Sequence, residues 1–305
     1  MSQSAERGRA AGGLQTSAAM SIDLEDWFHV ENLKSAIPPS TWPSQADRVR
    51  ASTERILDIF ERTGTVATFF CLGWVAERAP QLVQLIANRG HEIASHGYAH
   101  QLIYQQDIKA FRSDVVRAKD LLQEITGSAV IGYRAPSFSI TDAALDVLQE
   151  AGYRYDSSWF PVGGHDRYGR VDMHSRTAQR HTADRPAGAQ VPWLLLDNGL
   201  AELPITTLQV AGKNLPWGGG GWFRLYPSRL FRSGFQRAIR RAGGGVFYLH
   251  PWEVDPDQPR VNGLKRSHAF RHYVNLGRTA QRLERLCRSV TFGRCDEILG
   301  LRGAV

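Results

Sequence analysis

Two histidines stand four residues apart, His96 and His100, in the stretch S-H-G-Y-A-H. Side chains at this spacing share one face of a helix or of a tight helical turn. Two neutral imidazoles on one face can bind one metal ion, whereas the alternative is a pair of unrelated histidines in a polar loop. The spacing alone does not decide between these interpretations, so the rest of the sequence has to supply the remaining ligands.

Three carboxylates, Asp23, Glu25 and Asp26, follow a short apolar strand pattern. As structural residues they could cap a helix or face water. With the two histidines, one carboxylate would complete a three-ligand zinc site that keeps one position open for water. A second carboxylate could remove the proton from that water. The residues between the histidines are G-Y-A, without the glutamate of H-E-x-x-H, so these acids are the candidate bases.

Two more polar residues end later strand patterns. Arg134 stands in R-A-P-S-F and could orient an acidic group or form an ordinary surface ion pair. His250 stands in Y-L-H-P-W-E and could be a structural histidine or the general acid for a leaving amine. Several aromatic residues could stack on sugar rings, although we expect most of them to lie partly in the core. These are Trp159, Trp217, Trp222, Tyr226 and Trp252.

The elements that must position these residues alternate between strand and helix. Apolar residues at helical spacing predict helices over residues 44–62, 75–88, 107–125 and 141–151. Short apolar strand patterns separate these helices, which predicts a parallel sheet or an α/β barrel. The candidate residues fall at the carboxyl ends of the predicted strands, where such folds build their sites.

Composition and charge narrow the possible partners. The chain has 305 residues, of which 42% are hydrophobic, and this suits one large domain or two small ones. Its net charge of +7 comes without a lysine-rich tract or a recognisable nucleic-acid module. We therefore expect no nucleic acid, while a phosphate-bearing partner or an anionic membrane surface fits the charge. Cys71, Cys287 and Cys295 are too widely spaced for a disulfide framework or a Cys-ligated zinc site.

The predicted organisation is a disordered leader at 1–17 and one catalytic domain at 18–305. Residues 160–240 are expected to form a substrate-loop insertion and an extension within that domain. The polar stretch at 160–190 is long for a loop in a compact domain, which indicates a functional role. The sequence shows no hydrophobic signal core and no transmembrane pattern, and this predicts a cytoplasmic location.

The order of the motifs resembles the polysaccharide deacetylase (NodB-homology, carbohydrate esterase) superfamily. The acidic strand end, H-x-x-x-H, R-x-P, D-x-S-W at Asp156 and L-H follow one another as they do there. The stretches S-I-D-L-E-D-W-F-H-V and N-L-P-W-G-G-G-G-W-F-R-L-Y-P are most similar to the branch found with exopolysaccharide and PEP-CTERM (exosortase) loci. The resemblance covers residues 20–290 approximately. It implies an irregular (β/α) barrel that removes acetyl groups from sugar polymers.

The resemblance also implies a metal site and a base. His96 and His100 would bind zinc or another divalent metal. If the acids are aligned contiguously, Glu25 is the base and Asp26 the third ligand, and this assignment is preferred. The other alignment, D-x-D or D-x-E as in some relatives, makes Asp23 the base and Glu25 the ligand. A strand that is still regular there would put both side chains on one face.

The remaining roles follow from the same resemblance. Arg134 would tether the base, His250 would be the general acid, and Leu249 would line the acetyl pocket. The expected substrate contacts are Tyr133, Pro136, Phe138, Trp159, Leu249 and Trp252.

The implied activity is hydrolysis of N-acetyl groups on a polysaccharide or lipid-linked saccharide intermediate in exopolysaccharide biosynthesis. A lipid-linked substrate would bring the protein to the inner membrane face as a peripheral protein. Two other functions stay open, an amidohydrolase acting on a small amide or cyclic imide and a non-catalytic saccharide-binding barrel.

Overall fold

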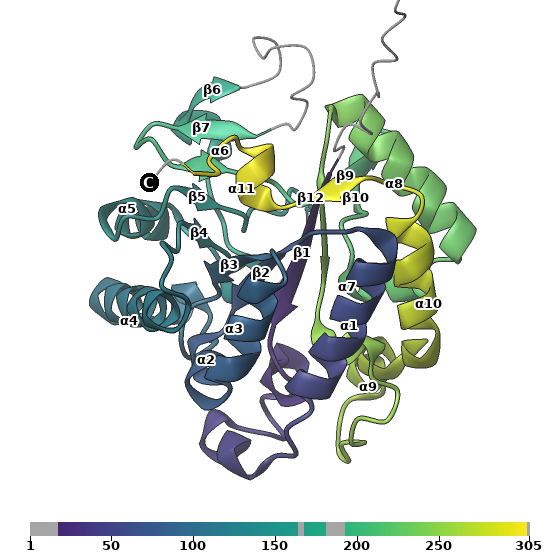
Figure 1. Ribbon diagram of the computed structural model, residues 1–305. Coiled ribbons are helices and arrows are strands. Elements are labelled where there is room, and N and C mark those ends of the chain that lie inside the picture. Colours follow the sequence, from purple (N-terminus) through teal and green to yellow (C-terminus); the bar gives the residue numbers. More distant parts are fainter. Residues whose placement is uncertain (1–17, 164–167, 181–192, 304–305) are drawn as a thin grey trace, which may run out of the picture.

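A curved, mostly parallel sheet forms the centre of the molecule. The computed structural model describes residues 18–163, 168–180 and 193–303, so the predicted leader and part of the 160–190 stretch lie outside the described residues. Along the sheet the strands follow the order β11-β1-β2-β3-β4-β5-β8-β7-β6, and β12 pairs with the start of β1 (Figure 1). The parallel strands are β1 (Ala18–Leu24), β2 (Thr68–Cys71), β3 (Glu92–Ser95), β4 (Gly132–Tyr133), β5 (Tyr155–Asp156), β8 (Ala201–Glu202), β11 (Val246–Leu249) and β12 (Phe292–Gly293). β6 (Thr177–Arg180) and β7 (Leu194–Leu196) continue the sheet antiparallel.

Backbone hydrogen bonds of residues 203–219 connect the β5 side of the sheet with the β11 side. Leu203 N–H donates to the Asp156 carbonyl next to β5, and Thr206 N–H donates to the Val246 carbonyl of β11. Tyr248 N–H then donates to the Gly218 carbonyl. The chain therefore closes the sheet with an irregular segment in place of regular ladders. The predicted irregular α/β barrel is confirmed.

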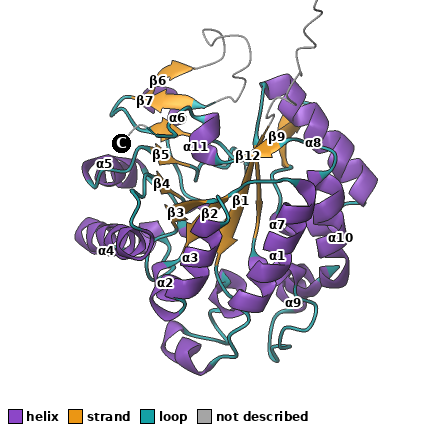
Figure 2. Ribbon diagram, viewed as in Figure 1, coloured by secondary structure: helices purple, strands orange, loops and turns teal. Residues whose placement is uncertain are grey.

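Helices cover the outside of this barrel (Figure 2). They are α1 (Val49–Thr63), α2 (Gly73–Arg78), α3 (Pro80–Asn88), α4 (Ile108–Thr126), α5 (Asp142–Glu150), α8 (Ser228–Ala242) and α10 (Leu276–Cys287). Shorter helices are α6 (Met173–Arg176), α7 (Gly220–Leu225), α9 (Arg266–Tyr273) and α11 (Cys295–Ile298), and β9 (Thr207–Val210) pairs with β10 (Lys213–Pro216) as a hairpin. The 3-10 turns are η1 (Trp27–His29), η2 (Glu31–Leu33), η3 (Pro39–Ser44), η4 (Ile103–Gln105), η5 (Pro136–Phe138) and η6 (Pro251–Val254).

The predicted helices are present, with one division and shifted ends. The helix predicted at 75–88 is two helices, α2 and α3, which meet at Ala79 and Pro80. Proline has no backbone N–H and cannot continue α2, so it starts α3 at its first position. The helix predicted from 44 begins only at Val49, after η3. In the part of the chain that the structure describes, no helix combines the length and apolarity needed to cross a membrane.

Alternation along β1 separates the apolar core from the site. Ile22 and Leu24 face the helices and belong to the main core cluster. Ser21 and Asp23 point to the opposite face, inside the barrel, because successive strand residues alternate. Both faces of β1 are buried, as expected for a parallel strand covered on both sides. Asp23 is therefore delivered to the carboxyl end of the barrel interior.

Candidate metal centre

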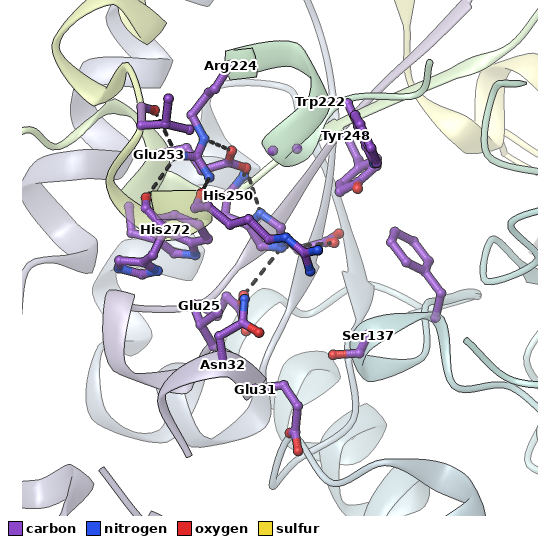
Figure 3. Close-up of a pocket in the computed structure, with 18 of the residues that line it drawn as sticks. Glu25, Glu31, Asn32, Ser137, Trp222, Arg224, Tyr248, His250, Glu253 and His272 are labelled. Atoms are coloured by element: carbon purple, nitrogen blue, oxygen red, sulfur yellow. Dashed lines mark hydrogen bonds and ion pairs between the residues drawn. The ribbon is translucent and has the colours of Figure 1, made fainter. Parts of the chain in front are cut away.

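One pocket lies at the carboxyl ends of β1, β3 and β11 and collects most of the predicted polar residues (Figure 3). Asp23, Glu25, His96, His100 and His250 all line it. These residues come from three strand ends that are far apart in the sequence and close in the sheet, where β11 is next to β1 and only β2 separates β1 from β3. The predicted convergence at this edge is what the structure shows.

Glu25, His96 and His100 form a buried group of ligand atoms within 4.8 Å of one another. The His96 Nδ1–H donates to the Arg134 carbonyl oxygen over 2.8 Å, which leaves His96 Nε2 free to bind. His100 Nε2 lies 2.8 Å from Glu25 Oε2. One carboxylate and two imidazoles are a common donor set for a catalytic zinc ion.

The buried atoms of this group fit a divalent cation. Glu25 Oε2 is buried and no hydrogen bond of acceptable geometry satisfies it, although His100 Nε2 is close. Burial would raise the pKa of Glu25, but the histidines around it, His100 foremost, hold that pKa well below its usual range. Burial lowers the pKa of His96 to about 4, so its ring is neutral near pH 7 and can act as a ligand.

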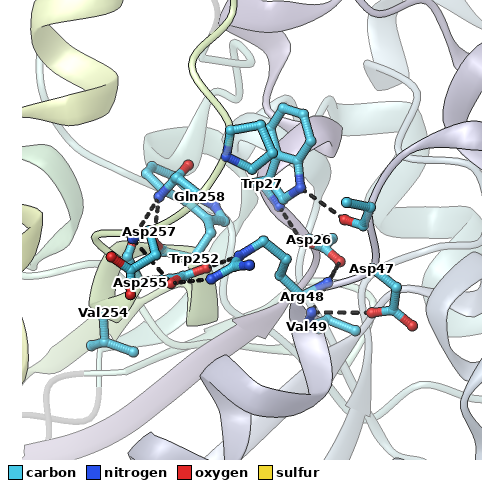
Figure 4. Close-up of polar contacts among 12 residues, drawn as sticks. Asp26, Trp27, Asp47, Arg48, Val49, Trp252, Val254, Asp255, Asp257 and Gln258 are labelled. Carbon is cyan, nitrogen blue, oxygen red and sulfur yellow. Dashed lines mark hydrogen bonds and ion pairs between the residues drawn. The ribbon is translucent and has the colours of Figure 1, made fainter.

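Asp26 is not part of this group, and the preferred assignment of Asp26 as ligand and Glu25 as base is corrected here. Asp26 Oδ1 accepts from Trp27 N–H over 2.7 Å. Asp26 Oδ2 accepts from Arg48 N–H over 2.8 Å and from Val49 N–H over 2.9 Å, at the start of α1 (Figure 4). A carboxylate stabilises the positive end of a helix there. The alternative alignment, with Glu25 among the ligands and Asp23 as the candidate base, fits the geometry.

The two histidines sit on a loop after β3 and not on the helix or helical turn that their spacing indicated. Gly97 and His100 both have left-handed φ values, 70° and 51°. A Cβ on Gly97 would lie 2.7 Å from Asp114 Oδ1. The Asp114 carboxylate of α4 accepts from Tyr98 N–H and Ala99 N–H and so fixes the loop. The rings of His96 and His100 are 5.4 Å apart at their centroids.

Arg134 holds Asp23 in the barrel interior. The guanidinium is fully buried, and its Nη1 donates to Asp23 Oδ1 over 2.7 Å and to Ser21 Oγ over 2.8 Å. Its Nε and Nη2 donate to the carbonyl and hydroxyl of Ser157. Asp23 is thereby fixed, with Oδ2 3.7 Å from His250 Nε2. A carboxylate in this position can accept a proton inside the pocket.

His250 faces the metal group from the end of β11. Its Nε2 lies 3.3 Å from Glu25 Oε1, and its Nδ1–H donates to Glu253 Oε1 over 2.8 Å. Burial would lower the pKa of His250, but the hydrogen bond that its ring donates to Glu253 and the neighbouring carboxylates raise it to about 9. These carboxylates favour the protonated ring, whose Nε2 faces the pocket and could donate a proton there.

The predicted substrate contacts divide into two groups. Phe138 and Trp252 line the pocket. The other expected contacts do not line it: Tyr133, Pro136 and Leu249 are buried elsewhere, and Trp159 lines a separate surface cavity. Leu249 points into the outer core because it is out of phase with Tyr248, which lines the pocket in its place.

The sequence reasoning missed several lining residues. Arg224 and Glu253 form a buried ion pair behind His250. Glu253 follows His250 by three residues, a spacing that could have signalled a contact within a turn. Nothing local in W-F-R-L-Y marks Arg224 as buried, because its partners lie 29 to 50 residues away. Trp222 and Phe270 also line the pocket.

Two family models match consecutive parts of the chain. Residues 42–155 match the model described as "Polysaccharide deacetylase", and residues 157–300 match "Domain of unknown function (DUF3473)". The junction falls at β5, before the segments that close the barrel. The metal group therefore lies on one side of this boundary and His250 on the other.

Known relatives align with about a third of the chain. A peptidoglycan deacetylase of Helicobacter pylori is 29% identical over 104 residues, which are 34% of this chain and 36% of that protein. A peptidoglycan-N-acetylglucosamine deacetylase of Bacillus cereus is 32% identical over 101 residues, 33% of this chain and 37% of that protein. The chain thus spans about a third of the length of the curated relatives it matches.

Solved structures share the fold over almost the whole chain. A putative polysaccharide deacetylase from Mycobacterium smegmatis has a TM-score of 0.59 at 19% identity and covers 96% of this chain and 92% of its own. A peptidoglycan N-acetylglucosamine deacetylase has a TM-score of 0.51 at 14% identity and covers 94% of this chain and 90% of its own. The expected deacetylase-type barrel is confirmed as a fold.

Proposed function

We propose that this chain, whose residues 42–155 match the polysaccharide deacetylase model, belongs to that superfamily and is a metal-dependent deacetylase that hydrolyses N-acetyl groups on a saccharide. The observation that carries the proposal is the meeting of the Glu25, His96 and His100 group with two proton-transfer residues in one pocket. Asp23 and His250 both line the pocket beside that group, with Asp23 Oδ2 and His250 Nε2 3.7 Å apart.

The chain's own residues divide the reaction between them. When bound to Glu25, His96 and His100, a divalent ion would supply Lewis acidity and acidify a water molecule. Asp23 takes one proton from that water molecule while the water oxygen forms a bond to the acetyl carbonyl carbon. His250 donates one proton to the sugar nitrogen as the carbon–nitrogen bond breaks. The products are acetate and a free amine.

Metal content and acetate release test this proposal. We expect about one divalent ion per chain in the wild type by elemental analysis, and its loss in His96→Ala. Asp23→Asn should keep the metal and lower kcat for acetate release from N-acetylated oligosaccharides by roughly 10²–10⁴-fold. Metal-free wild type after zinc is added back, or Asp23→Asn with activity within a few-fold of wild type, would contradict it.

We further propose that the substrate is a lipid-linked saccharide of exopolysaccharide biosynthesis. The protein would be cytoplasmic and would bind this substrate at the inner face of the membrane. The charge distribution supports it. Residues 224–288 contain 14 basic and 4 acidic residues, a net charge of +10, whereas the whole chain has +7. Two exposed apolar side chains of this segment, Leu225 and Phe270, line the pocket, and exposed Trp222 lines it just before the segment. Cations beside exposed apolar groups suit an anionic membrane surface.

A further inference from the structure

We infer that Glu253 and Arg224 are positioning residues that fix the His250 ring for proton donation. The segment matched as a domain of unknown function would then form the acid half of the active site. This inference rests on the proposed deacetylase function and deepens it. It assigns a task to residues 157–300, which the family description leaves without one.

Glu253 is fully buried and all its described contacts serve the orientation of His250. Its Oε1 accepts from the His250 ring Nδ1–H over 2.8 Å and from the His250 backbone N–H over 3.1 Å. Its Oε2 accepts from Arg224 Nε over 2.6 Å. With Nδ1–H held in this way, the other ring nitrogen, Nε2, points toward Glu25 and Asp23. A partner on one nitrogen of a histidine decides what the other can do.

Arg224 ties this carboxylate to α9. The buried guanidinium donates to three backbone carbonyls in the last turn of that helix and just after it, at Arg271, His272 and Val274. A cation at a helix C-terminus is favourable because the free carbonyls there carry partial negative charge. Since α9 also brings Phe270 and Arg271 to the pocket, one arginine connects the pocket rim to the residue that orients the acid.

Ring stacking also restricts rotation of the His250 ring. Trp252 lies between two imidazoles, with its ring 5.3 Å from His250 at an interplanar angle of 26° and 4.6 Å from His272 at 14°. A ring stacked on one side and hydrogen-bonded at Nδ1 cannot turn over without breaking both contacts. His250 is therefore preorganised with Nε2 in the pocket.

A fixed His250 ring matters for one step of the reaction, the cleavage of the carbon–nitrogen bond. An amine of a sugar is a poor leaving group and has to receive a proton as the carbon–nitrogen bond breaks. That proton comes from His250 Nε2, so a ring that turns or loses its Nδ1 partner donates less efficiently. Attack of water on the carbonyl depends on Asp23 and the metal group and does not need Glu253.

The metal group and the acid group come from different parts of the chain. Asp23, Glu25, His96, His100 and Arg134 precede residue 156, whereas His250, Glu253, Arg224 and the carbonyls of 271–274 follow it. β11 pairs directly with β1 and brings the two groups together, with Ile22 opposite Leu249. The polysaccharide deacetylase model therefore matches part of the metal half, and the second model matches the acid half.

The leaving group of the substrate separates positioning from a general structural role. We expect Glu253→Gln, Glu253→Ala and Arg224→Lys to lower kcat on an N-acetyl oligosaccharide by roughly 10–10³-fold with little change in KM, because general acid catalysis contributes about 10²–10⁴-fold. On 4-nitrophenyl acetate, whose leaving group needs no proton, the same variants should stay within about threefold of wild type. The mildest substitution, Glu253→Gln, should retain the most activity. Metal content should be unchanged.

A matched control is Glu31→Gln, which alters another pocket-lining carboxylate that pairs with Lys34 and not with His250. It should show no dependence on the leaving group. Equal losses on both substrates, or a loss of metal in the Glu253 variants, would overturn the inference and leave the deacetylase proposal standing if the wild type still releases acetate.

Nitrogen-15 NMR of the imidazole side chains tests the hydrogen bond between His250 and Glu253 without any substrate. The wild type, compared with His250→Asn, should show a His250 Nδ1–H that is protected from exchange, and Glu253→Gln should shift it. Absence of this Nδ1–H in the folded wild type would overturn the inference even if no substrate is found.

Discussion

Neighbouring acids in D-L-E-D do different work. Asp23 is bound by Arg134, Glu25 faces the histidines, and Asp26 accepts three backbone N–H groups. The difference comes from direction, because the chain turns after Leu24 and Asp26 leaves the barrel interior. One residue of displacement therefore separates a candidate metal ligand, Glu25, from a helix anchor, Asp26.

Substitution of Asp26 should lower the stability of the fold and leave metal binding unchanged. Asp26→Ala removes an acceptor from the start of α1, and we expect the free energy of unfolding to fall by about 1–2 kcal/mol. Glu25→Gln should leave the unfolding of the metal-free protein nearly unchanged and weaken metal binding at least tenfold. Urea unfolding in EDTA and metal titration of both variants measure the contrast. Loss of metal in Asp26→Ala with Glu25→Gln unaffected would return the ligand role to Asp26.

This residue also shows what the sequence could predict. Period-two alternation put Asp23 and Glu25 on one face, and the motifs placed His96, His100, Arg134 and His250 at one edge of the sheet. The role of Asp26 depended on Arg48 N–H and Val49 N–H, which only the tertiary structure brings to it. Glu253 and Arg224 were missed for the same reason, since buried ion pairs between distant segments leave no periodic signal.

At the scale of elements, α7 and α9 form the rim of the pocket. Trp222 and Leu225 belong to α7 and Phe270 to α9, with exposed fractions of 36%, 43% and 57%. Lys265 and Arg266, at the start of α9, are also exposed. Because residues of both helices line the pocket, a membrane bound by α7 and α9 would lie next to the pocket opening.

A vesicle assay tests the proposed membrane contact of α7 and α9. We expect the protein to sediment with vesicles that contain phosphatidylglycerol, less so as salt rises, and not with pure phosphatidylcholine. The double variant Trp222→Ala, Phe270→Ser should weaken binding about tenfold or more. Val210→Ser, which alters an exposed apolar residue of β9, is the control. Equal binding by both variants, or none by the wild type, would contradict the contact.

At the scale of the whole molecule, the barrel interior holds acidic pairs away from the metal group. Asp156 and Glu202 are adjacent strand ends of β5 and β8 and are fully buried. Burial raises the pKa of Asp156 to about 6 and that of Glu202 well above its usual range, so the folded protein keeps a proton that the unfolded chain loses. Glu92 behaves alike, because burial and the charge of Asp296 raise its pKa to about 8.

These raised pKa values make stability depend on pH. Their stabilising contribution is present below pH 4, where the unfolded carboxyls are also protonated, and is lost as pH rises through 6 to 8. We therefore expect the free energy of unfolding to fall between pH 5 and 8 in urea titrations of the metal-free protein. Glu202→Gln should flatten that slope, and Glu92→Gln should flatten it independently. A slope unchanged in both variants would show that the pairs do not hold the proton.

The pairing of β1 with strands from the end of the chain has a consequence for synthesis on the ribosome. β1 bears Asp23 and leads into Glu25, but it is bordered by β11 and, at its start, by β12. These partners end at Leu249 and Gly293, more than 220 residues after β1. β1 therefore completes its ladder only after β11 and β12 have been synthesised. Until then the acids of β1 and Glu25 lie in an incomplete sheet, and the candidate site forms only once β11 has paired with β1.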